Sequence, residues 1–213
     1  MKLISLLTLS VLLTLGVVLA QRRTPPVARA TAQAVEEDAR SQTLRPFTEQ
    51  EKADIVRRLF ASPRMAARVQ TQRHRALRVG VASTDKTGKI LAAGKRVAEV
   101  VVFNYERGRA SRLFVDPSTG EVLAEEEIRG RPQSSPEEIK DAVDIISRDS
   151  RLSELLRENT VVEGGFIVDG PRNLPRHHRF IQIQLLSPDR LRLRRVVVVD
   201  LTTSQIASSK ETY

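Results

Sequence analysis

The stretch RLFVDPSTGEVLAEEEI, Arg112–Ile128, has the pattern of a strand, a tight turn and a second strand. Asp116 begins the turn, Pro117 follows where a φ of about −65° is favoured, and Gly120 stands where a positive φ is tolerated. A second stretch of the same outline, RVVVVDLTTSQIASSKE, occupies residues 195–211 without the Pro and the Gly of the first turn. The second turn is therefore expected to be looser or of another type, and the repeated outline predicts a duplicated fold.

Each copy is preceded by the same helix-start signal. Thr48 is followed three residues later by Glu51, and Ser135 is followed three residues later by Glu138. In such a capping box, the hydroxyl and the carboxylate satisfy backbone N–H groups that a helix leaves unpaired at its start. Apolar residues at helical spacing come next, and runs with strand character come after them. This order predicts an α+β fold in which each copy is a helix packed on an antiparallel meander sheet.

The predicted modules span residues 46–130 and 131–213. A module of about 80 residues buries only a modest apolar surface by itself. The sequence contains no cysteine, so neither disulfide bonds nor thiolate metal sites can add stability. We therefore expect the two modules to pack together into one stable unit.

Residues 1–20 contain Lys2 and then the apolar run LISLLTLSVLLTLGVVLA, which ends at Ala20 before the polar QRR. This pattern is typical of a signal peptide cleaved after Ala20, so we expect a secreted or periplasmic protein without stable membrane insertion after cleavage. An uncleaved membrane anchor is the alternative, because the run is nearly long enough to span a bilayer. Residues 21–45 are rich in Pro, Ala and charged residues and are predicted to be a flexible linker.

Basic residues dominate the charge of the chain, since 35 Lys and Arg stand against 26 Asp and Glu, a formal net charge of +9. An exported protein rarely meets nucleic acid, so an acidic protein partner or an acidic envelope component is expected. Arg190, Arg192 and Arg194 alternate in the run RLRLRR and would form a row on one face of a strand. This row is the predicted anion- and partner-binding site. The alternative is a charged sheet surface or edge that discourages aggregation.

His177 and His178 are weak candidates for a metal site. They are adjacent, so their side chains point to opposite sides of an extended segment, and no third ligand stands at a diagnostic spacing. A surface pair in a loop is the alternative. The sequence contains no glycine-rich phosphate loop, no Ser-His-Asp set and no Glu-x-x-His metal helix. It therefore predicts no catalytic residues and no bound cofactor.

Three segments of the sequence, taken in order, resemble a known family. They are RPFTEQEKADIVRRL at residues 45–59, VVFNYERGRASRLFVDPSTGEVLAEEEIRGRPQSSPEEIKDAVDIISRDSRLSELL at residues 101–156, and GGFIVDGP at residues 164–171. The ordered combination resembles the tandem non-catalytic N-terminal domains of copper amine oxidases, in which a PLT-x-x-E helix start, a VD-x-x-TG-x-V hairpin and an LTPEE helix recur. The resemblance implies two tandem cystatin-like modules.

The matching residues do not carry the chemistry of that family. Copper amine oxidases convert a Tyr in the motif T-x-x-N-Y-D/E to topaquinone, beside a copper ion held by three His, two of them spaced His-x-His. Here Val101 stands where the motif before Asn104-Tyr105-Glu106 has Thr, and His177 and His178 are adjacent rather than spaced His-x-His. The resemblance thus implies that copper and topaquinone belong to the family's catalytic domain, which does not fit in a chain of this length. We expect Asn104-Tyr105-Glu106 to be a strand end.

We therefore expect an exported, non-catalytic binding protein rather than an enzyme. The partner that the resemblance implies is the catalytic subunit of a separate amine (tyramine) oxidase, to which this chain would be an accessory subunit. The hairpin VDPSTGEVL is also similar to that of PepSY-type exported domains. A PepSY-like envelope module that binds or restrains a protease, or another anionic partner, is the alternative.

Overall fold

The computed structural model describes residues 45–82, 96–157 and 160–211, all of which belong to one compact unit, Thr43–Tyr213. The predicted signal peptide and nearly all of the predicted linker lie outside the described residues. No helix in the described ranges is both long and apolar enough to cross a membrane.

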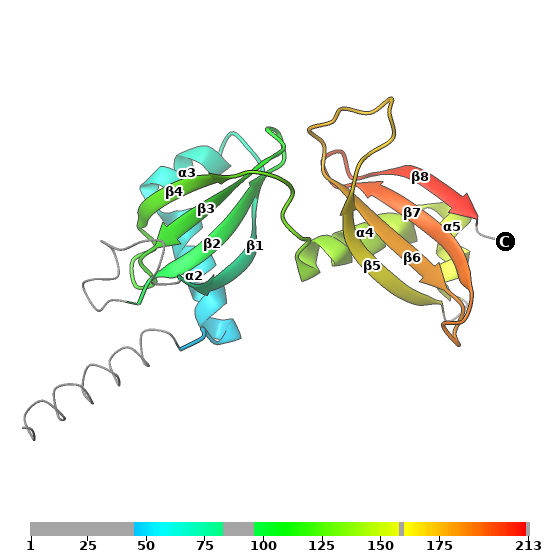
Figure 1. Cartoon of the computed structure of the whole chain (residues 1–213), viewed down its shortest axis with the longest axis horizontal. Coiled ribbons are helices and arrows are strands. Elements are labelled where there is room, and N and C mark those ends of the chain that lie inside the picture. The colour runs from blue at the N-terminus through cyan, green and yellow to red at the C-terminus, as the bar shows by residue number, and fades with distance from the viewer. Residues whose placement is uncertain (1–44, 83–95, 158–159, 212–213) are drawn as a thin grey trace, which may run out of the picture. The chain divides into compact units, whose positions relative to one another are not determined.

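The first module consists of two helices followed by a four-stranded sheet (Figure 1). The helices are α2 (Glu49–Ala61) and α3 (Pro63–Val69). The strands are β1 (His74–Val81), β2 (Ala98–Asn104), β3 (Arg109–Val115) and β4 (Val122–Ile128). All neighbouring strands are antiparallel, in the order β1-β2-β3-β4, so the sheet is the predicted meander.

The second module repeats this plan (Figure 1). Its helices are α4 (Pro136–Arg148) and α5 (Ser150–Arg157). Its strands are β5 (Val161–Val168), β6 (Phe180–Leu186), β7 (Leu193–Asp200) and β8 (Gln205–Glu211), paired antiparallel in the order β5-β6-β7-β8. Both predicted capping boxes are present, at Thr48 and at Ser135. The α+β class with two antiparallel sheets is confirmed.

Each module contains a second, short helix that the sequence analysis did not predict. The first helix ends because Ser62 has extended backbone, with φ −64° and ψ 144°, and Pro63 then begins α3. Proline disfavours helical backbone in the residue before it, which explains the break. In the second module Asp149, with a ψ of 118°, separates α4 from α5.

An aspartate organises the hairpin turn in both copies. Asp116 and Asp200 each accept, through Oδ1, the N–H of the residue two positions later, at 2.8 and 2.9 Å. Gly120 has a φ of +78°, and a Cβ there would collide with the backbone of Arg58 in α2, so glycine is required. Ser204 takes the same left-handed conformation, with a φ of 57°. The second copy thus keeps the aspartate contact and the left-handed residue although it lacks the Pro and the Gly.

The two modules bury a common core. In the first module, Ile55, Leu59 and Met65 of α2 and α3 are at most 1% exposed and pack on one face of the sheet. A second, larger cluster contains side chains of both modules. Its members include Val101, Phe103, Tyr105, Ala142, Ile146, Ile181, Ile183, Val197 and Val199. This continuous cluster agrees with the expectation that the modules pack together.

An arginine just before the second strand of each sheet makes a recurring set of contacts. In the first module, Arg96 donates to Glu51 Oε1 at 2.8 Å and to the carbonyl oxygens of residues 45–46 at 2.7 and 2.9 Å. Its guanidinium carbon lies 3.9 Å from the centroid of the Phe47 ring. We call this set of contacts the arginine staple, because it ties the segment that leads into a helix to the segment that leads into a strand.

Arg179 forms the second staple. Its Nε and Nη2 donate to Glu138 Oε1 and Oε2 at 2.6 and 2.8 Å, and it also donates to the carbonyl oxygens of residues 132–133. The aromatic ring beside its guanidinium is Phe103 of the first module, with the centroid at 4.5 Å. Tyr105, also of the first module, donates its hydroxyl proton to Glu138 Oε1 at 2.6 Å. The second staple is therefore completed by the first module.

The two staples differ in burial. The side chain of Arg96 is 23% exposed, whereas the side chains of Arg179 and Glu138 are 1% and 0% exposed. Ions buried in this way cost several kcal/mol unless they are paired and hydrogen-bonded. Burial, and then the Glu138 carboxylate, raise the pKa of Tyr105, so its hydroxyl stays protonated and keeps donating.

The segment before α4 covers an edge of the second sheet. β5 is an edge strand, and its Val168 carbonyl accepts a hydrogen bond from Arg131 Nη1 at 2.7 Å. The carbonyl of Gly165 accepts another from the hydroxyl of Ser134. Unpaired strand edges are sites of intermolecular pairing, so these contacts protect β5.

Replacing Arg179 by Met is expected to destabilise the protein by about 3–5 kcal/mol, because the Glu138 carboxylate is left buried without its cation. The matched change Arg96→Met should cost much less, because Glu51 stays in contact with solvent. Urea unfolding followed by circular dichroism measures both, and the double variant Glu138→Gln/Arg179→Met should recover part of the loss. Equal losses of unfolding free energy in the two single variants would contradict the claim that burial sets the cost of removing the arginine.

The shared cluster predicts that the modules do not fold independently. A fragment of residues 46–131 lacks the α4 and β6 partners of Phe103 and Tyr105. It should unfold at a lower temperature and less cooperatively than residues 46–213 in differential scanning calorimetry. A fragment transition equal to that of the longer chain would refute the shared core. The module boundary at residue 130 itself stays a prediction.

Candidate functional site

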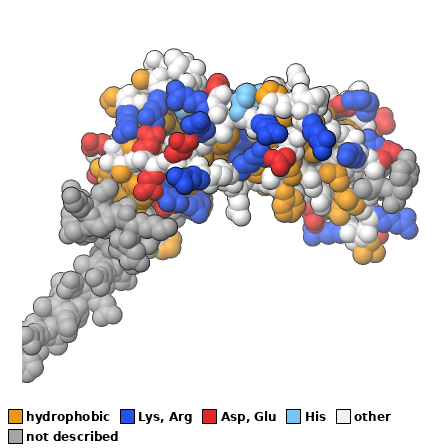
Figure 2. All heavy atoms as spheres, turned by 45° about the horizontal axis from the view of Figure 1, so that its top comes forward, with side chains coloured by type: hydrophobic (Ala, Val, Ile, Leu, Met, Phe, Trp, Pro, Cys, Tyr) orange, Lys and Arg blue, Asp and Glu red, His pale blue; other side chains and the backbone are white. Residues whose placement is uncertain are grey.

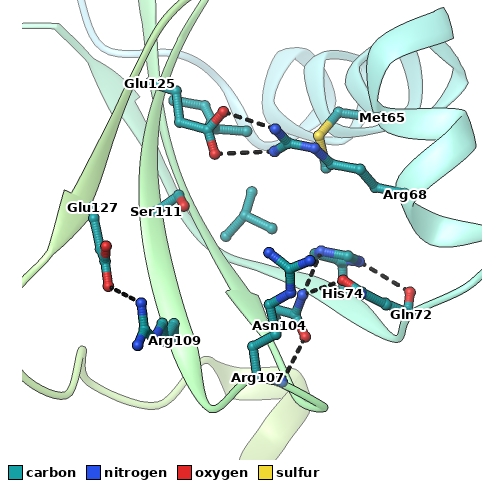
Figure 3. A pocket seen from close by; sticks show the side chains of 12 residues that line it. Met65, Arg68, Gln72, His74, Asn104, Arg107, Arg109, Ser111, Glu125 and Glu127 are labelled. Atoms are coloured by element: carbon teal, nitrogen blue, oxygen red, sulfur yellow. Dashed lines mark hydrogen bonds and ion pairs between the residues drawn. The ribbon is translucent and has the colours of Figure 1, made fainter.

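A polar pocket of about 480 Å³ lies beside α3, on the face of the first sheet that the helices cover (Figure 3). Side chains alternate along a strand, so the face that carries Val102 and Leu113 also carries Asn104 and Ser111. The core on this face thus gives way to polar residues near the end of β2. The charged lining residues are Arg68, Arg107, Arg109, Glu125 and Glu127.

Glu125 is the most strongly bonded acid of the pocket. It accepts two hydrogen bonds from Arg68, at 2.9 and 3.1 Å, and one from Arg64, at 2.8 Å. The two arginines are four residues apart on α3 and therefore share one face of the helix. Hydrogen bonding from Arg68 lowers the pKa of Glu125, so the carboxylate stays ionised. Its charge holds α3 on β4.

Asn104 links three other lining residues (Figure 3). Its Nδ2 donates to Gln72 Oε1 at 2.6 Å and lies 3.1 Å from His74 Nε2, and its Oδ1 accepts the N–H of Arg107 at 3.0 Å. His74 Nδ1 lies 2.9 Å from the carbonyl oxygen of Gln72. This pattern assigns the proton to Nδ1 and makes Nε2 the acceptor. Both ring nitrogens are therefore engaged within the fold.

The Arg107 guanidinium is the free charge of this pocket. It makes no hydrogen bond or ion pair with any residue in the described ranges, and Figure 3 shows its side chain extending beside His74. Arg109, in contrast, pairs with Glu127 at 3.1 Å. The arrangement suits a small polar ligand with an anionic group, because one unpaired cation stands among polar groups that already have partners.

The predicted arginine row is wrong in its geometry. β7 begins only at Leu193, so Arg190 and Arg192 precede the strand and Arg194 alone lies in it. Arg190 has a φ of 61°, and its N–H donates to the carbonyl of Ser187 at 2.8 Å in a turn. The alternation of side chains along a strand therefore does not put the three arginines in a row on one face.

Turn chemistry explains the difference. Asp189 Oδ1 accepts the N–H of Leu191 at 3.1 Å and a hydrogen bond from the Ser187 hydroxyl, which closes the turn before β7 starts. The Arg190 guanidinium reaches Glu163 at 3.5 Å, while Arg192 and Arg194 line a hollow with Leu191. Anion binding by these arginines stays a prediction.

The two adjacent histidines lie in the connection between β5 and β6. Their ring centroids are 4.8 Å apart, and the ring planes make an angle of 83°. His178 Nδ1 lies 2.7 Å from Asp200 Oδ2, so this ring is held by the turn of the second hairpin, while His177 is exposed. Among the residues that the structure describes, no group of three or more His, Cys, Asp or Glu could hold a metal ion. The metal site stays a prediction.

The Asn104-Tyr105-Glu106 sequence is a strand end, as predicted, since β2 stops at Asn104. Tyr105 is only 3% exposed, and its hydroxyl is bonded to Glu138. Glu106 accepts the N–H of Arg73 at 2.8 Å. Tyr105 therefore stabilises the junction between the two modules, whereas Glu106 is bonded within the first module.

Arginines in the β5–β6 connection were missed by the sequence analysis. Arg172 and Arg176 line a second pocket, of about 570 Å³, together with Arg131. The signal is present in the run PRNLPRHHR, in which a proline directly precedes each of these two arginines.

Comparisons with known proteins give limited similarity. No protein-family model matches the chain, and no curated protein sequence matches it. Among solved structures, the chain is similar to a copper-containing benzylamine oxidase from Hansenula polymorpha, with 11% sequence identity and a TM-score of 0.44. The similarity covers 80% of this chain and 30% of the oxidase.

The lowered pKa of Glu125 predicts acid sensitivity. Its contribution to stability is present above its unfolded-state pKa of about 4.3 and is lost as the pH falls through the lower folded-state pKa. The free energy of unfolding of Glu125→Gln should therefore fall less than that of the parent when the pH is lowered from about 7 to about 3. Urea unfolding at the two pH values measures this. The exposed Glu127→Gln is the control, and identical pH dependence in the parent and Glu125→Gln would refute the assignment.

Proposed function

We propose that the protein is a non-catalytic binding protein that acts outside the cytoplasm. The observation that carries this proposal is the use of potentially reactive side chains as structural partners. Tyr105 donates a hydrogen bond from its hydroxyl to Glu138, and Glu138 is paired with Arg179. A buried tyrosine and a buried glutamate that are bonded in this way cannot also act as a nucleophile or a base without opening the core.

The charges of the surface favour an acidic partner. Figure 2 shows Lys and Arg side chains spread over the visible face, with Asp and Glu between them. The guanidinium groups of Arg107, Arg172 and Arg176 have no partner in the described ranges. Unpaired guanidinium groups bind carboxylates through two parallel hydrogen bonds. A net charge of +9 also speeds the approach of an acidic molecule.

In the finer form of the proposal, the partner is the catalytic subunit of a separately encoded amine oxidase. It is supported by the ordered motifs that resemble the N-terminal domains of copper amine oxidases, with two cystatin-like modules in tandem. Copper and topaquinone then belong to the partner. Export depends on residues 1–20, with cleavage after Ala20.

A PepSY-like role is the second candidate. It is favoured by the Asp116–Gly120 hairpin turn, which is built around its aspartate, and by the unpaired arginines. In this role the protein binds or restrains an acidic envelope protease. The two candidates differ in the activity that accompanies the protein when it is isolated with its partner.

Purified residues 21–213 are expected not to oxidise tyramine or phenethylamine, with or without added copper. The reason is that Tyr105, which stands in the only N-Y-E sequence, is buried and bonded to Glu138. A peroxide assay and an absorbance spectrum check this. Copper-dependent peroxide production together with quinone absorbance would contradict it.

Isolation of the tagged full-length protein from the envelope fraction of the organism that encodes it tests the partner. The oxidase proposal expects tyramine-dependent peroxide production in the eluate, lost after a high-salt wash that releases the partner. Protease activity without oxidase activity would favour the PepSY-like role. An eluate with neither activity would overturn both.

A further inference from the structure

The connection between β5 and β6, Asp169–Arg179, builds a basic pocket of about 570 Å³. Three arginines line it: Arg172 and Arg176 from the connection, and Arg131 from the segment before α4. Half-buried apolar residues stand next to them. These apolar lining residues are Pro171 and Leu174. The pocket thus combines guanidinium groups with apolar surface.

The backbone that carries these arginines is well fixed. The N–H of Leu174 donates to the carbonyl of Pro171 at 3.0 Å, and the N–H of His178 donates to the carbonyl of Pro175 at 3.1 Å, which closes two successive turns. Both turns begin at a proline, whose ring fixes φ. The His178 ring is in turn held by Asp200 at 2.7 Å. Binding to such a segment costs less conformational entropy than binding to a flexible loop.

Gly170 brings the start of the connection close to the sheet. A Cβ at this position would collide with the ring of Phe180, the first residue of β6. The backbone at Gly170 therefore rests directly on a buried aromatic ring. This contact gives the pocket a fixed wall.

The charges of the pocket are unbalanced. The guanidinium groups of Arg172 and Arg176 form no hydrogen bond or ion pair with any residue that the structure describes. Arg131 donates to Asp169 at 2.7 Å, but the Asp169 side chain is 92% exposed. Such a surface pair is worth little, so an incoming carboxylate can replace it. The pocket then contains three arginine cations and one carboxylate, Asp169, which an incoming carboxylate can displace.

We propose that this pocket binds an acidic peptide segment of a partner protein, with carboxylates on Arg172 and Arg176 and an apolar side chain against Leu174 and Pro171. The inference rests on the proposed binding function and names the site where the acidic partner is held. A peptide fits better than an anionic polymer, because only a peptide offers an apolar side chain next to its carboxylates. The salt dependence of binding follows from the exposed charges.

A matched pair of variants tests the site. Arg172→Gln/Arg176→Gln and Arg148→Gln/Arg151→Gln remove the same charge from two exposed segments of the second module, and Arg148 and Arg151 do not line the pocket. The probe is a fluorescein-labelled peptide in which Glu residues flank one Leu, and its affinity is read by fluorescence anisotropy with residues 21–213. We expect the first variant to weaken binding about tenfold or more, because each lost charge-assisted hydrogen bond is large, and the second to stay within about twofold.

Further arms make the result decisive. Circular dichroism shows whether each variant is folded, and Arg172→Lys/Arg176→Lys keeps the charge while removing the planar fork, so it should bind between the parent and the Gln variant. Equal losses in the two matched variants would mean that only net charge matters and would overturn the site. Polyphosphate that binds as tightly at the same arginines would overturn the peptide as partner.

The site can also fail separately from the proposed function. If Arg172→Gln/Arg176→Gln retains the oxidase or protease activity that accompanies the parent protein on isolation, this pocket is not the partner site, although the binding function stands. If the activity is lost with this variant but kept with Arg148→Gln/Arg151→Gln, both the function and the site are supported.

Discussion

The buried ion pair between Glu138 and Arg179 is the interaction on which the rest of the structure depends. The Glu138 carboxylate accepts the N–H of Ser135 at the start of α4, both ends of the Arg179 fork before β6, and the hydroxyl of Tyr105 after β2. A charge that is removed from water must find all of its partners within the protein. Three elements distant in sequence are therefore held in one arrangement.

The two arginine staples show how duplicated modules can become one folding unit. In the first copy, Arg96 uses the ring of Phe47, which belongs to its own module, and remains partly solvated. In the second copy, Arg179 uses Phe103 of the other module and is fully enclosed. The contact that stays within one module in the first copy therefore joins the two modules in the second copy. The first module completes the core of the second, so any change to the end of β2 acts on both.

Local signals in the sequence predicted local structure well. The two capping boxes and the Asp116–Gly120 turn depend on residues at most four positions apart, so their pattern is visible in the chain itself. The prediction of an arginine row was wrong because it extended the alternation in RLRLRR across a turn that Asp189 closes. The second staple was not predicted, because Arg179 and Glu138 are 41 positions apart and no periodicity connects them. The pocket of the β5–β6 connection likewise depends on Arg131, which is distant in sequence.

The contacts of Arg131 and Ser134 with β5 have a consequence for the lifetime of the protein in a protease-rich environment. These residues bond two carbonyl groups of an edge strand, those of Gly165 and Val168, and they belong to the segment that joins the two modules. A single cut within that segment would free the edge without removing any strand from the sheet. The nicked molecule would then offer its β5 edge to the same edge of another copy, and proteolysis would be converted into self-association.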